Sequence, residues 1–288
     1  MLAKITIWGV VILILSGLFV REWQGSQVVG HTQYRFNLAL IVPDQGVRFV
    51  SFDPTEQAIL EIPFPTNLAI NSRKSGEYSI SSLYKLGTYS GNGGAFARQK
   101  IQGFMRVPVP GYLVTKGSFG SGLFKSILGT QETSLSRLDS VLLLWRLSKY
   151  KHRSVGEDEL TRAGVIDKNI YHPERLQEYV GTRLFDWGIG ESAQTIAIIN
   201  ASGEDGLGSD MADFLTNLGM DVVMVRSASP DELLELTEVT TADEVSAKEL
   251  GYIFQNLFDF ERFKLEAVGS EYRANVLMRV GKDAKELF

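Results

Sequence analysis

The chain of 288 residues contains no cysteine and only three histidines. The absence of cysteine excludes a disulfide framework, a thiol nucleophile and a cysteine metal site. His31, His152 and His172 stand apart, without an H-x-x-x-H or similar pairing. Because a metal site needs convergent ligands, we interpret these histidines as surface or turn residues and predict no metal site.

Several motifs of nucleotide and acyl chemistry are also missing. No G-x-x-x-x-G-K-[ST] loop occurs, and Gly203, Gly206 and Gly208 run as G-x-x-G-x-G instead of G-x-G-x-x-G. The serines between Gly117 and Gly122 do not have the G-x-S-x-G spacing of a hydrolase elbow. These absences disfavour a nucleotide-binding loop and a serine hydrolase.

The most informative segment reads as strand, glycine turn, helix and strand. An apolar run over residues 196–199 leads through the glycines into a helix that begins near Ser209, and Gly219 stands where a left-handed helix stop belongs. The sequence predicts a βαβ unit. Its loop is a candidate site, either a structural turn capped by the Asn200 side chain or a set of free N–H groups for an anion. The candidate residues are Asn200, Ser202, Gly203, Gly206 and Gly208.

This segment resembles a known family. Asn200-Ala-Ser-Gly, then Gly206-Leu-Gly, a short helix, Leu218-Gly-Met-Asp-Val and a terminal strand into Gly281-Lys-Asp are similar to the C-terminal domain of LytR-type cell-envelope proteins. The resemblance covers about Glu191 to Asp283.

The N-terminus carries sixteen residues without a charge, Ile5 to Val20, with Trp8 and Trp23 near the two ends. This length approaches the ~20 residues that span a bilayer. A cleavable signal peptide is the alternative, but the residues after the run offer no small-x-small cleavage site. We therefore expect an uncleaved transmembrane anchor in the cell membrane, with a cytoplasmic N-terminus and the bulk of the chain outside the cytoplasm.

Charge divides the chain into two halves. Residues 1–190 hold 21 Lys or Arg against 15 Asp or Glu, and residues 191–288 hold 8 against 19. A basic half suits anionic lipid or polymer, whereas the acidic half would repel nucleic acid. The alternative is that the asymmetry serves only solubility.

The first half is predicted to begin with an antiparallel meander. Strands are expected over residues 34–42, 47–52 and 58–62, a helix over 96–105 and a strand over 111–115. The segment from Leu135 to Tyr150 predicts a long helix. Ser136 and Asp139 have capping-box spacing, and Leu138, Val141 and Trp145 belong to the stripe expected to face the core.

A second resemblance covers this half. Phe52-Asp-Pro, Glu61-Ile-Pro-Phe-Pro-Thr, Leu83-Tyr-Lys-Leu-Gly, Gly93-Gly and Val107-Pro-Val-Pro-Gly-Tyr are similar to the catalytic domain of the LytR-CpsA-Psr family. That resemblance implies transfer of glycopolymers from polyprenyl pyrophosphate to peptidoglycan, with Mg²⁺ and arginines on the pyrophosphate. In the family's Ser-Ile-Pro-Arg-Asp-Thr motif, however, this chain has Phe64 for the arginine and Pro65 for the aspartate.

These replacements bear on activity. Each lost charge-stabilising donor costs roughly 10²- to 10³-fold in rate, and the family's later arginine cluster is not found either. The remaining cations have two interpretations. They offset the carbonyls and dipole at the end of the long helix, or they form a retained anion-binding strip, whose candidates are Arg98, Arg106, Arg146, Lys149 and Arg153.

The sequence thus predicts an α/β (α+β) fold, with an N-terminal transmembrane helix followed by two extracytoplasmic α/β domains. The expected parts are an anchor (1–23), a degenerate LytR-CpsA-Psr-like domain (24–153), a linker with a short helix that starts at Pro173 (154–193) and a LytR C-terminal-like domain (194–288).

The predicted function is a non-catalytic binding or scaffold module at the cell wall, with no catalytic residue and no cofactor. Its expected partners are the membrane and a cell-wall polymer or envelope protein, and no nucleic acid. The alternative is a Mg²⁺-dependent phosphotransferase with a rearranged site, the only hypothesis that uses a metal.

Overall fold

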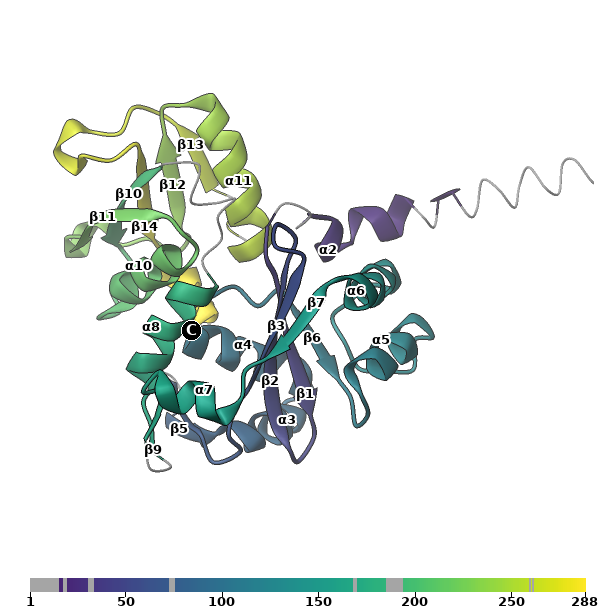
Figure 1. Ribbon diagram of the computed structural model, residues 1–288. Coiled ribbons are helices and arrows are strands. Elements are labelled where there is room, and N and C mark those ends of the chain that lie inside the picture. The colour runs from purple at the N-terminus through teal and green to yellow at the C-terminus, as the bar shows by residue number, and fades with distance from the viewer. Residues whose placement is uncertain are drawn as a thin grey trace, which may run out of the picture.

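The computed structural model describes residues 16–17, 20–30, 34–72, 76–167, 170–184, 194–258, 260 and 262–288. Figure 1 shows two units, each built of a sheet with helices against it. We call them the proximal domain, which holds β1 to β9, and the distal domain, which holds β10 to β14.

The proximal sheet has the order β6-β1-β2-β3-β7. The three central strands are β1 (Phe36–Val42), β2 (Gly46–Asp53) and β3 (Ala58–Pro63), and they pair antiparallel, which confirms the predicted meander. The outer strands are parallel to their neighbours: β6 (Gly111–Val114) pairs with β1, and β7 (Lys151–Ser154) with β3. The sequence did not predict β7, because its side chains are all exposed and show no buried face.

Helices cover both faces of this sheet. On one face, α5 (Phe119–Ile127) and α6 (Arg137–Lys149) form a core with Phe52 and other inward residues of the strands. On the other face, α3 (Leu83–Tyr89) and α4 (Gly93–Met105) pack with Phe49. Two shorter elements precede them, the hairpin of β4 (Ala69–Ser72) and β5 (Gly76–Ser79), and the turn η1 (Ile80–Ser82).

The structure confirms the cap of α6 and corrects its orientation. The Asp139 N–H donates to Ser136 Oγ at 3.0 Å, and the Ser136 N–H donates to Asp139 Oδ2 at 3.0 Å, so the capping box is formed. The expected core stripe is wrong at Val141 and Trp145, which are 46% and 54% exposed. The leucines of the stripe do pack in or against the core: Leu135, Leu142, Leu143, Leu144 and Leu147. The buried face of α6 consists of Asp139, Ser140, Leu143 and Arg146.

The segment predicted as a linker contains α7 (Glu157–Arg162), β8 (Ile166–Asp167), β9 (Ile170–Tyr171) and α8 (Pro173–Arg183). Pro173 occupies the first turn of α8, as expected. Residues 185–193 lie outside the described part. The segment completes the proximal core on the α4 face through the buried side chains of Val155, Leu160, Val165, Ile166, Leu176, Tyr179, Val180 and Leu184.

The transmembrane helix in the predicted fold needs correction. In the described part of the chain, no helix combines the length and the apolar content that crossing a membrane requires. The described residues near the N-terminus include the charged Arg21 and Glu22, and α2 (Gln27–Gly30) is a single turn. Most of the predicted span, residues 1–15, 18 and 19, lies outside the described residues.

The distal domain opens with the βαβ unit expected from the sequence. β10 (Thr195–Asn200), α10 (Leu207–Asn217) and β11 (Asp221–Ser227) follow one another, and the two strands pair in parallel. Gly219 has a φ of +99°, which confirms the predicted left-handed stop after the helix.

The distal sheet has the order β11-β10-β14-β12-β13. Its remaining strands are β12 (Glu238–Thr241), β13 (Arg262–Leu265) and β14 (Val276–Val280). The helices α10 and α11 (Glu244–Phe258) share one core with residues of these strands. Short 3₁₀ turns complete the domain: η2 (Pro230–Glu232), η3 (Ser270–Tyr272) and η4 (Lys282–Leu287).

Candidate functional site

The glycine loop between β10 and α10 is held by its own polar groups. Asn200 Oδ1 accepts from the Ser202 hydroxyl at 2.6 Å and from the Ser202 N–H at 3.2 Å. Asn200 Nδ2 donates to the Glu204 carbonyl at 2.8 Å, and the Glu204 N–H donates to Ser202 Oγ at 3.1 Å. The loop therefore forms the side-chain-capped turn that the sequence suggested for Asn200.

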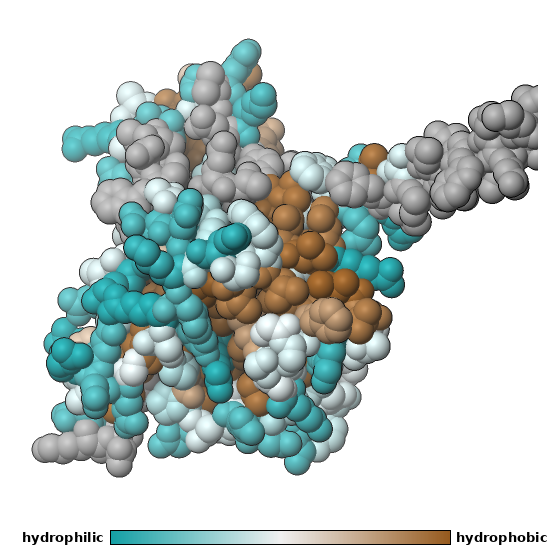
Figure 2. Space-filling model, turned by 45° about the vertical axis from the view of Figure 1, so that its right-hand side comes forward, coloured by the Kyte–Doolittle hydropathy of each residue, from teal (hydrophilic) through white to brown (hydrophobic). Residues whose placement is uncertain are grey.

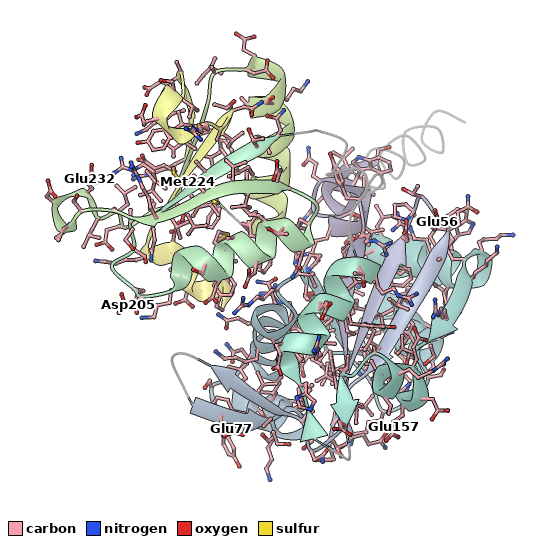
Figure 3. The ribbon with its side chains drawn as sticks, turned by 60° about the vertical axis from the view of Figure 1, so that its left-hand side comes forward. Glu56, Glu77, Glu157, Asp205, Met224 and Glu232 are labelled. Carbon is pink, nitrogen blue, oxygen red and sulfur yellow. The ribbon has the colours of Figure 1, made fainter. Side chains whose placement is uncertain are left out.

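The glycines of this loop allow backbone conformations and a close approach that other residues would not. Gly203 and Gly206 have φ values of +76° and +74°, a region that residues with a side chain rarely adopt. A Cβ atom on Gly208 would lie 2.9 Å from the Asn200 Cβ, so the helix start approaches the strand end too closely for any other residue. Glu204 forms an ion pair with Lys285 of η4. Asp205 lies on the outer edge of the loop (Figure 3).

In the proximal domain, the turn after β3 is filled by apolar side chains. Phe64 is 6% exposed and packs edge to face on Phe104 of α4, with 5.9 Å between the ring centroids. The Leu68 N–H donates to the Pro65 carbonyl at 3.0 Å, which closes the turn. Phe64 is thus part of the proximal core.

The nearest charged side chain along β3, Glu61, is already paired. Its Oε1 lies 3.0 Å from Arg48 Nη1, and its Oε2 lies 3.1 Å from His152 Nε2. Glu61 is 7% exposed, so little of its surface is accessible to a ligand.

The five predicted anion-binding residues lie on three elements: α4 with its C-terminal cap, α6 and β7. Arg98 of α4 donates to the Val109 carbonyl at 2.9 Å, and burial lowers the pKa of its guanidinium. Arg146 is 6% exposed on the core side of α6, where burial likewise lowers the pKa of the guanidinium. Lys149 is exposed at the end of α6. Arg153 of β7 pairs with Glu159 at 2.7 Å, and this hydrogen bond raises the pKa of the arginine.

Arg106, the fifth, joins the two domains. It ends α4 with a φ of +49°, and its Nη2 lies 2.8 Å from Asp210 Oδ1 of α10. A second ion pair joins Arg106 to Asp213, and Asn217 Nδ2 donates to the Arg106 carbonyl at 2.9 Å. The cation therefore holds the distal helix against the proximal domain.

A cluster that the sequence reasoning missed surrounds the start of α4. Glu132 Oε1 accepts from the Gly94 N–H at 3.0 Å, and Glu132 Oε2 accepts from the Tyr84 hydroxyl at 2.7 Å. The hydrogen bond to Glu132, then burial, raise the pKa of Tyr84 to about 12. A Cβ on Gly94 would meet the Tyr112 ring at 2.1 Å, which explains a glycine at this helix start. The Gly93-Gly94 pair is visible in the sequence. Its partner Glu132 could not be predicted from local patterns, because it is 38 residues from Gly94.

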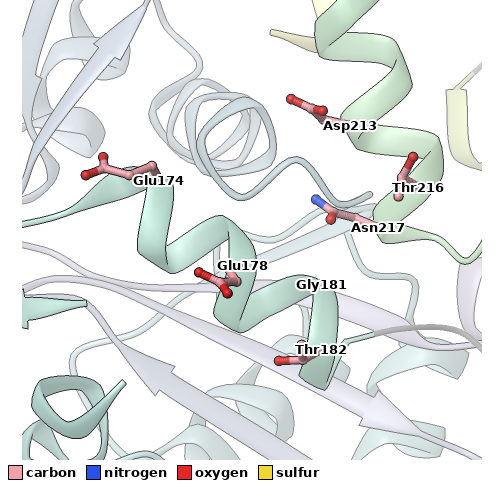
Figure 4. A pocket seen from close by; sticks show the side chains of 7 residues that line it. All are labelled: Glu174, Glu178, Gly181, Thr182, Asp213, Thr216 and Asn217. Carbon is pink, nitrogen blue, oxygen red and sulfur yellow. The ribbon is translucent and has the colours of Figure 1, made fainter. Parts of the chain in front are cut away.

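An open pocket of about 460 Å³ lies between α8 and α10 (Figure 4). Two of its acidic side chains, Glu174 and Glu178, project from α8, and Asp213 projects from α10. Asp213 already forms an ion pair with Arg106. Among the described residues, no group of three or more His, Asp or Glu is arranged to hold a metal ion. The full lining is Glu174, Glu178, Gly181, Thr182, Asp213, Thr216 and Asn217.

A family comparison matches the distal domain. Residues 193–262 match the family described as LytR cell envelope-related transcriptional attenuator. The chain therefore contains a LytR C-terminal domain. None of the curated proteins compared with the chain matches it.

Solved structures give only distant likenesses. A LytR-CPS2A-psr family protein, YwtF (TagT), with bound octaprenyl pyrophosphate lipid has 11% identity and a TM-score of 0.25, covering 71% of this chain and 79% of that one. TagT of Bacillus subtilis has 12% identity and a TM-score of 0.25, with coverage of 78% and 92%. A transcriptional regulator from Enterococcus faecalis has 15% identity and a TM-score of 0.28, with coverage of 85% and 93%. At these TM-scores the likenesses decide nothing about this chain.

Proposed function

We propose that this chain is a non-catalytic binding or scaffold module of the bacterial cell envelope that contacts a cell-wall polymer or an envelope protein. The observation that carries the proposal is the burial of Phe64. In the resemblance to the LytR-CpsA-Psr catalytic domain, this residue takes the place of an arginine that grips pyrophosphate. A side chain 6% exposed against Phe104 offers neither charge nor a hydrogen-bond donor.

The neighbouring cations support the same conclusion. Pyrophosphate transfer depends on positive groups aimed at developing negative charge. Arg98 donates to a backbone carbonyl, Arg106 pairs with Asp210, and Arg153 pairs with Glu159. These cations serve the fold of the chain.

The Mg²⁺ of the alternative hypothesis does not fit at this turn. The family's aspartate position is Pro65, which has no side-chain oxygen to offer a hard cation. The only carboxylate of β3, Glu61, is shared between Arg48 and His152. We therefore derive no metal-dependent step for this chain.

The link between the domains explains how such a module would act. The contacts of Arg106 with α10 hold the LytR C-terminal domain against the proximal domain. Gln99 and Gln102 of α4 add bonds to the carbonyls of Glu286 and Leu287 at the end of the chain. A ligand bound to either domain would thus be held at a defined position relative to the other.

Co-sedimentation with cell walls tests the proposal. The full chain is incubated with peptidoglycan carrying its wall polymer and with peptidoglycan from which the polymer has been removed, and heat-unfolded protein serves as the control. We expect the folded chain to sediment with at least one wall fraction or to capture a defined envelope protein. No binding to any wall fraction or envelope protein would overturn the proposal.

A further inference from the structure

Two pairs of large apolar side chains are exposed on adjacent helices of the proximal domain. Phe124 and Leu128, four residues apart on α5 and its C-terminal cap, are 56% and 59% exposed. Val141 and Trp145, four residues apart on α6, are 46% and 54% exposed. Single exposed apolar residues are ordinary on a folded protein, but a gathered set marks an interaction surface.

Three contacts fix how these pairs lie relative to each other. A Cβ on Gly120 would lie 3.5 Å from Leu147 Cδ2, the Ser126 and Ser140 hydroxyls are 2.7 Å apart, and a Cβ on Gly129 would lie 3.6 Å from Arg137 Nη2. As α5 advances, its partners on α6 come earlier in the chain, so the helices are antiparallel. Phe124 is therefore level with the turn that contains Val141.

We call the surface made by Phe124, Leu128, Val141 and Trp145 the α5–α6 face. Figure 2 brings forward the side of the molecule on which α5 and α6 lie in Figure 1, and it shows hydrophobic residues gathered there. The interior of this helix pair belongs to the core of Leu123 and Leu143, so the α5–α6 face is a second, outward apolar side.

Positive charges surround the α5–α6 face. Lys125 follows Phe124, Lys149 lies one turn beyond Trp145, and the Arg137 guanidinium reaches Gly129 beside Leu128. These three cations are exposed, and none forms an ion pair with the residues that the structure describes.

The two acidic residues of this region bond to other groups of the chain. Between residues 116 and 151 the chain has only two carboxylates, Glu132 and Asp139. Glu132 binds Tyr84 and the start of α4, and Asp139 is fully buried. The exposed charged side chains on α5 and α6 themselves, Lys125, Arg137 and Lys149, are therefore all positive.

The N-terminal sequence enters the fold beside this surface. Asp139 Oδ1 of α6 accepts from the Ser26 hydroxyl at 2.5 Å and from the Val28 N–H at 2.9 Å, which fixes α2 against α6. Trp23, just before α2, is 52% exposed. The charged residues Arg21 and Glu22 separate it from the uncharged sequence 5–20.

We propose that the α5–α6 face binds the surface of an anionic lipid bilayer. Aromatic and aliphatic side chains at the boundary between headgroups and acyl chains, ringed by Lys and Arg, are the chemistry of interfacial membrane attachment. Phe124, Val141 and Trp145 enter this boundary, while Lys125, Arg137 and Lys149 contact lipid phosphates. The helices α5 and α6 then lie along the membrane surface, and the contact is made by residues of these helices and their ends.

Single-cysteine labelling tests the proposal directly, because the chain has no cysteine of its own. Phe124→Cys and Val141→Cys are labelled with an environment-sensitive fluorophore in the full chain. The matched control is Tyr89→Cys on α3, which is 79% exposed and belongs to a helix on the opposite face of the same sheet. With vesicles of phosphatidylglycerol and phosphatidylcholine, we expect a blue shift at positions 124 and 141 and none at 89.

The charge requirement has its own measurement. Each Lys or Arg near an anionic surface contributes about 1 kcal/mol, or roughly fivefold in partitioning. Lys125→Gln with Arg137→Gln should therefore weaken vesicle binding by about 25-fold, and Lys85→Gln on α3 should leave it unchanged.

Three results would overturn the proposal. The labels at 124 and 141 could stay in water while the chain is bound to vesicles, which would assign attachment to another segment. Phosphatidylcholine vesicles alone could give the same shift, which would remove the anionic requirement. The labels could also shift with protein concentration in the absence of lipid, which would assign the α5–α6 face to a second copy of the chain.

Discussion

The turn after β3 and the loop after β10 carry motifs on which the sequence predictions rested, and they are stabilised in different ways. The proximal turn is held by apolar packing of Phe64 on Phe104. The distal glycine loop is held by hydrogen bonds among Asn200, Ser202 and Glu204. The comparison shows two ways to stabilise a loop. The proximal turn is stabilised by burying an aromatic side chain, and the distal loop is stabilised by hydrogen bonds among its own polar groups.

The largest effect is expected at the proximal turn. Phe64→Ala removes a buried aromatic side chain and should lower the free energy of unfolding by about 3 to 5 kcal/mol. Phe124→Ala, at a position 56% exposed, should change it by no more than about 0.5 kcal/mol. Urea denaturation of both variants measures the difference. Equal effects would show that Phe64 is not a core residue.

The contact between the domains comes next. Asp210→Ala removes a carboxylate 2.8 Å from Arg106 Nη2, and a hydrogen bond to a charged group contributes about 1.5 to 3 kcal/mol. We expect a loss of that size in thermal unfolding. Asp231→Ala, an exposed change in η2, is the control and should lie within about 0.5 kcal/mol of the parent. A similar stability for both variants would argue against a fixed domain contact.

The glycine loop should respond more weakly than the proximal turn. Gly203→Val forces a β-branched residue to a φ of +76° and should cost about 1 to 3 kcal/mol of stability. Gly156→Ala, at a negative φ with nothing within 4 Å of the added Cβ, is the matched control. Wall binding per folded molecule should be unchanged in both. Lost binding with intact stability would instead make the glycine loop a ligand site.

The smallest effect concerns pH. Hydrogen bonding to Glu132 raises the pKa of Tyr84 to about 12, and burial, then a hydrogen bond to Glu159, raises that of Tyr179 to about 12. Because the folded pKa values exceed the unfolded value of 10.0, the associated stability is complete below pH 10 and falls as the pH rises toward 12. Tyr84→Phe should remove part of the late phenolate absorbance and flatten this decline. An unchanged absorbance titration would contradict the Tyr84–Glu132 contact.

Local patterns in the sequence predicted the segments whose partners are close along the chain. The meander β1 to β3 and the βαβ unit of the distal domain were visible from apolar runs and turn residues. The cap of α6 was visible because Ser136 and Asp139 stand three residues apart. The Asn200 cap of the glycine loop likewise depends on atoms within four residues.

Features that depend on distant contacts were missed. The α6 sequence has apolar residues on two sides of the helix. Periodicity alone therefore could not show which side is buried and that Val141 and Trp145 face outward. The buried side includes Asp139, which accepts hydrogen bonds from Ser26 and Val28 more than 110 residues away. The same holds for Glu132 at the start of α4 and for the pairing of Arg106 with α10. Whether the predicted cations bind an anion stays a prediction.

The central claim is that Phe64 belongs to the hydrophobic core of the proximal domain, and that the chain therefore does not act on lipid-linked pyrophosphate. A thermal titration of the full chain with a polyprenyl pyrophosphate, with and without Mg²⁺, tests it most directly, because a ligand that binds only the folded state raises the melting temperature. We predict no rise at any Mg²⁺ concentration. A rise that needs Mg²⁺ and disappears in Arg98→Gln or Arg146→Gln would contradict the account.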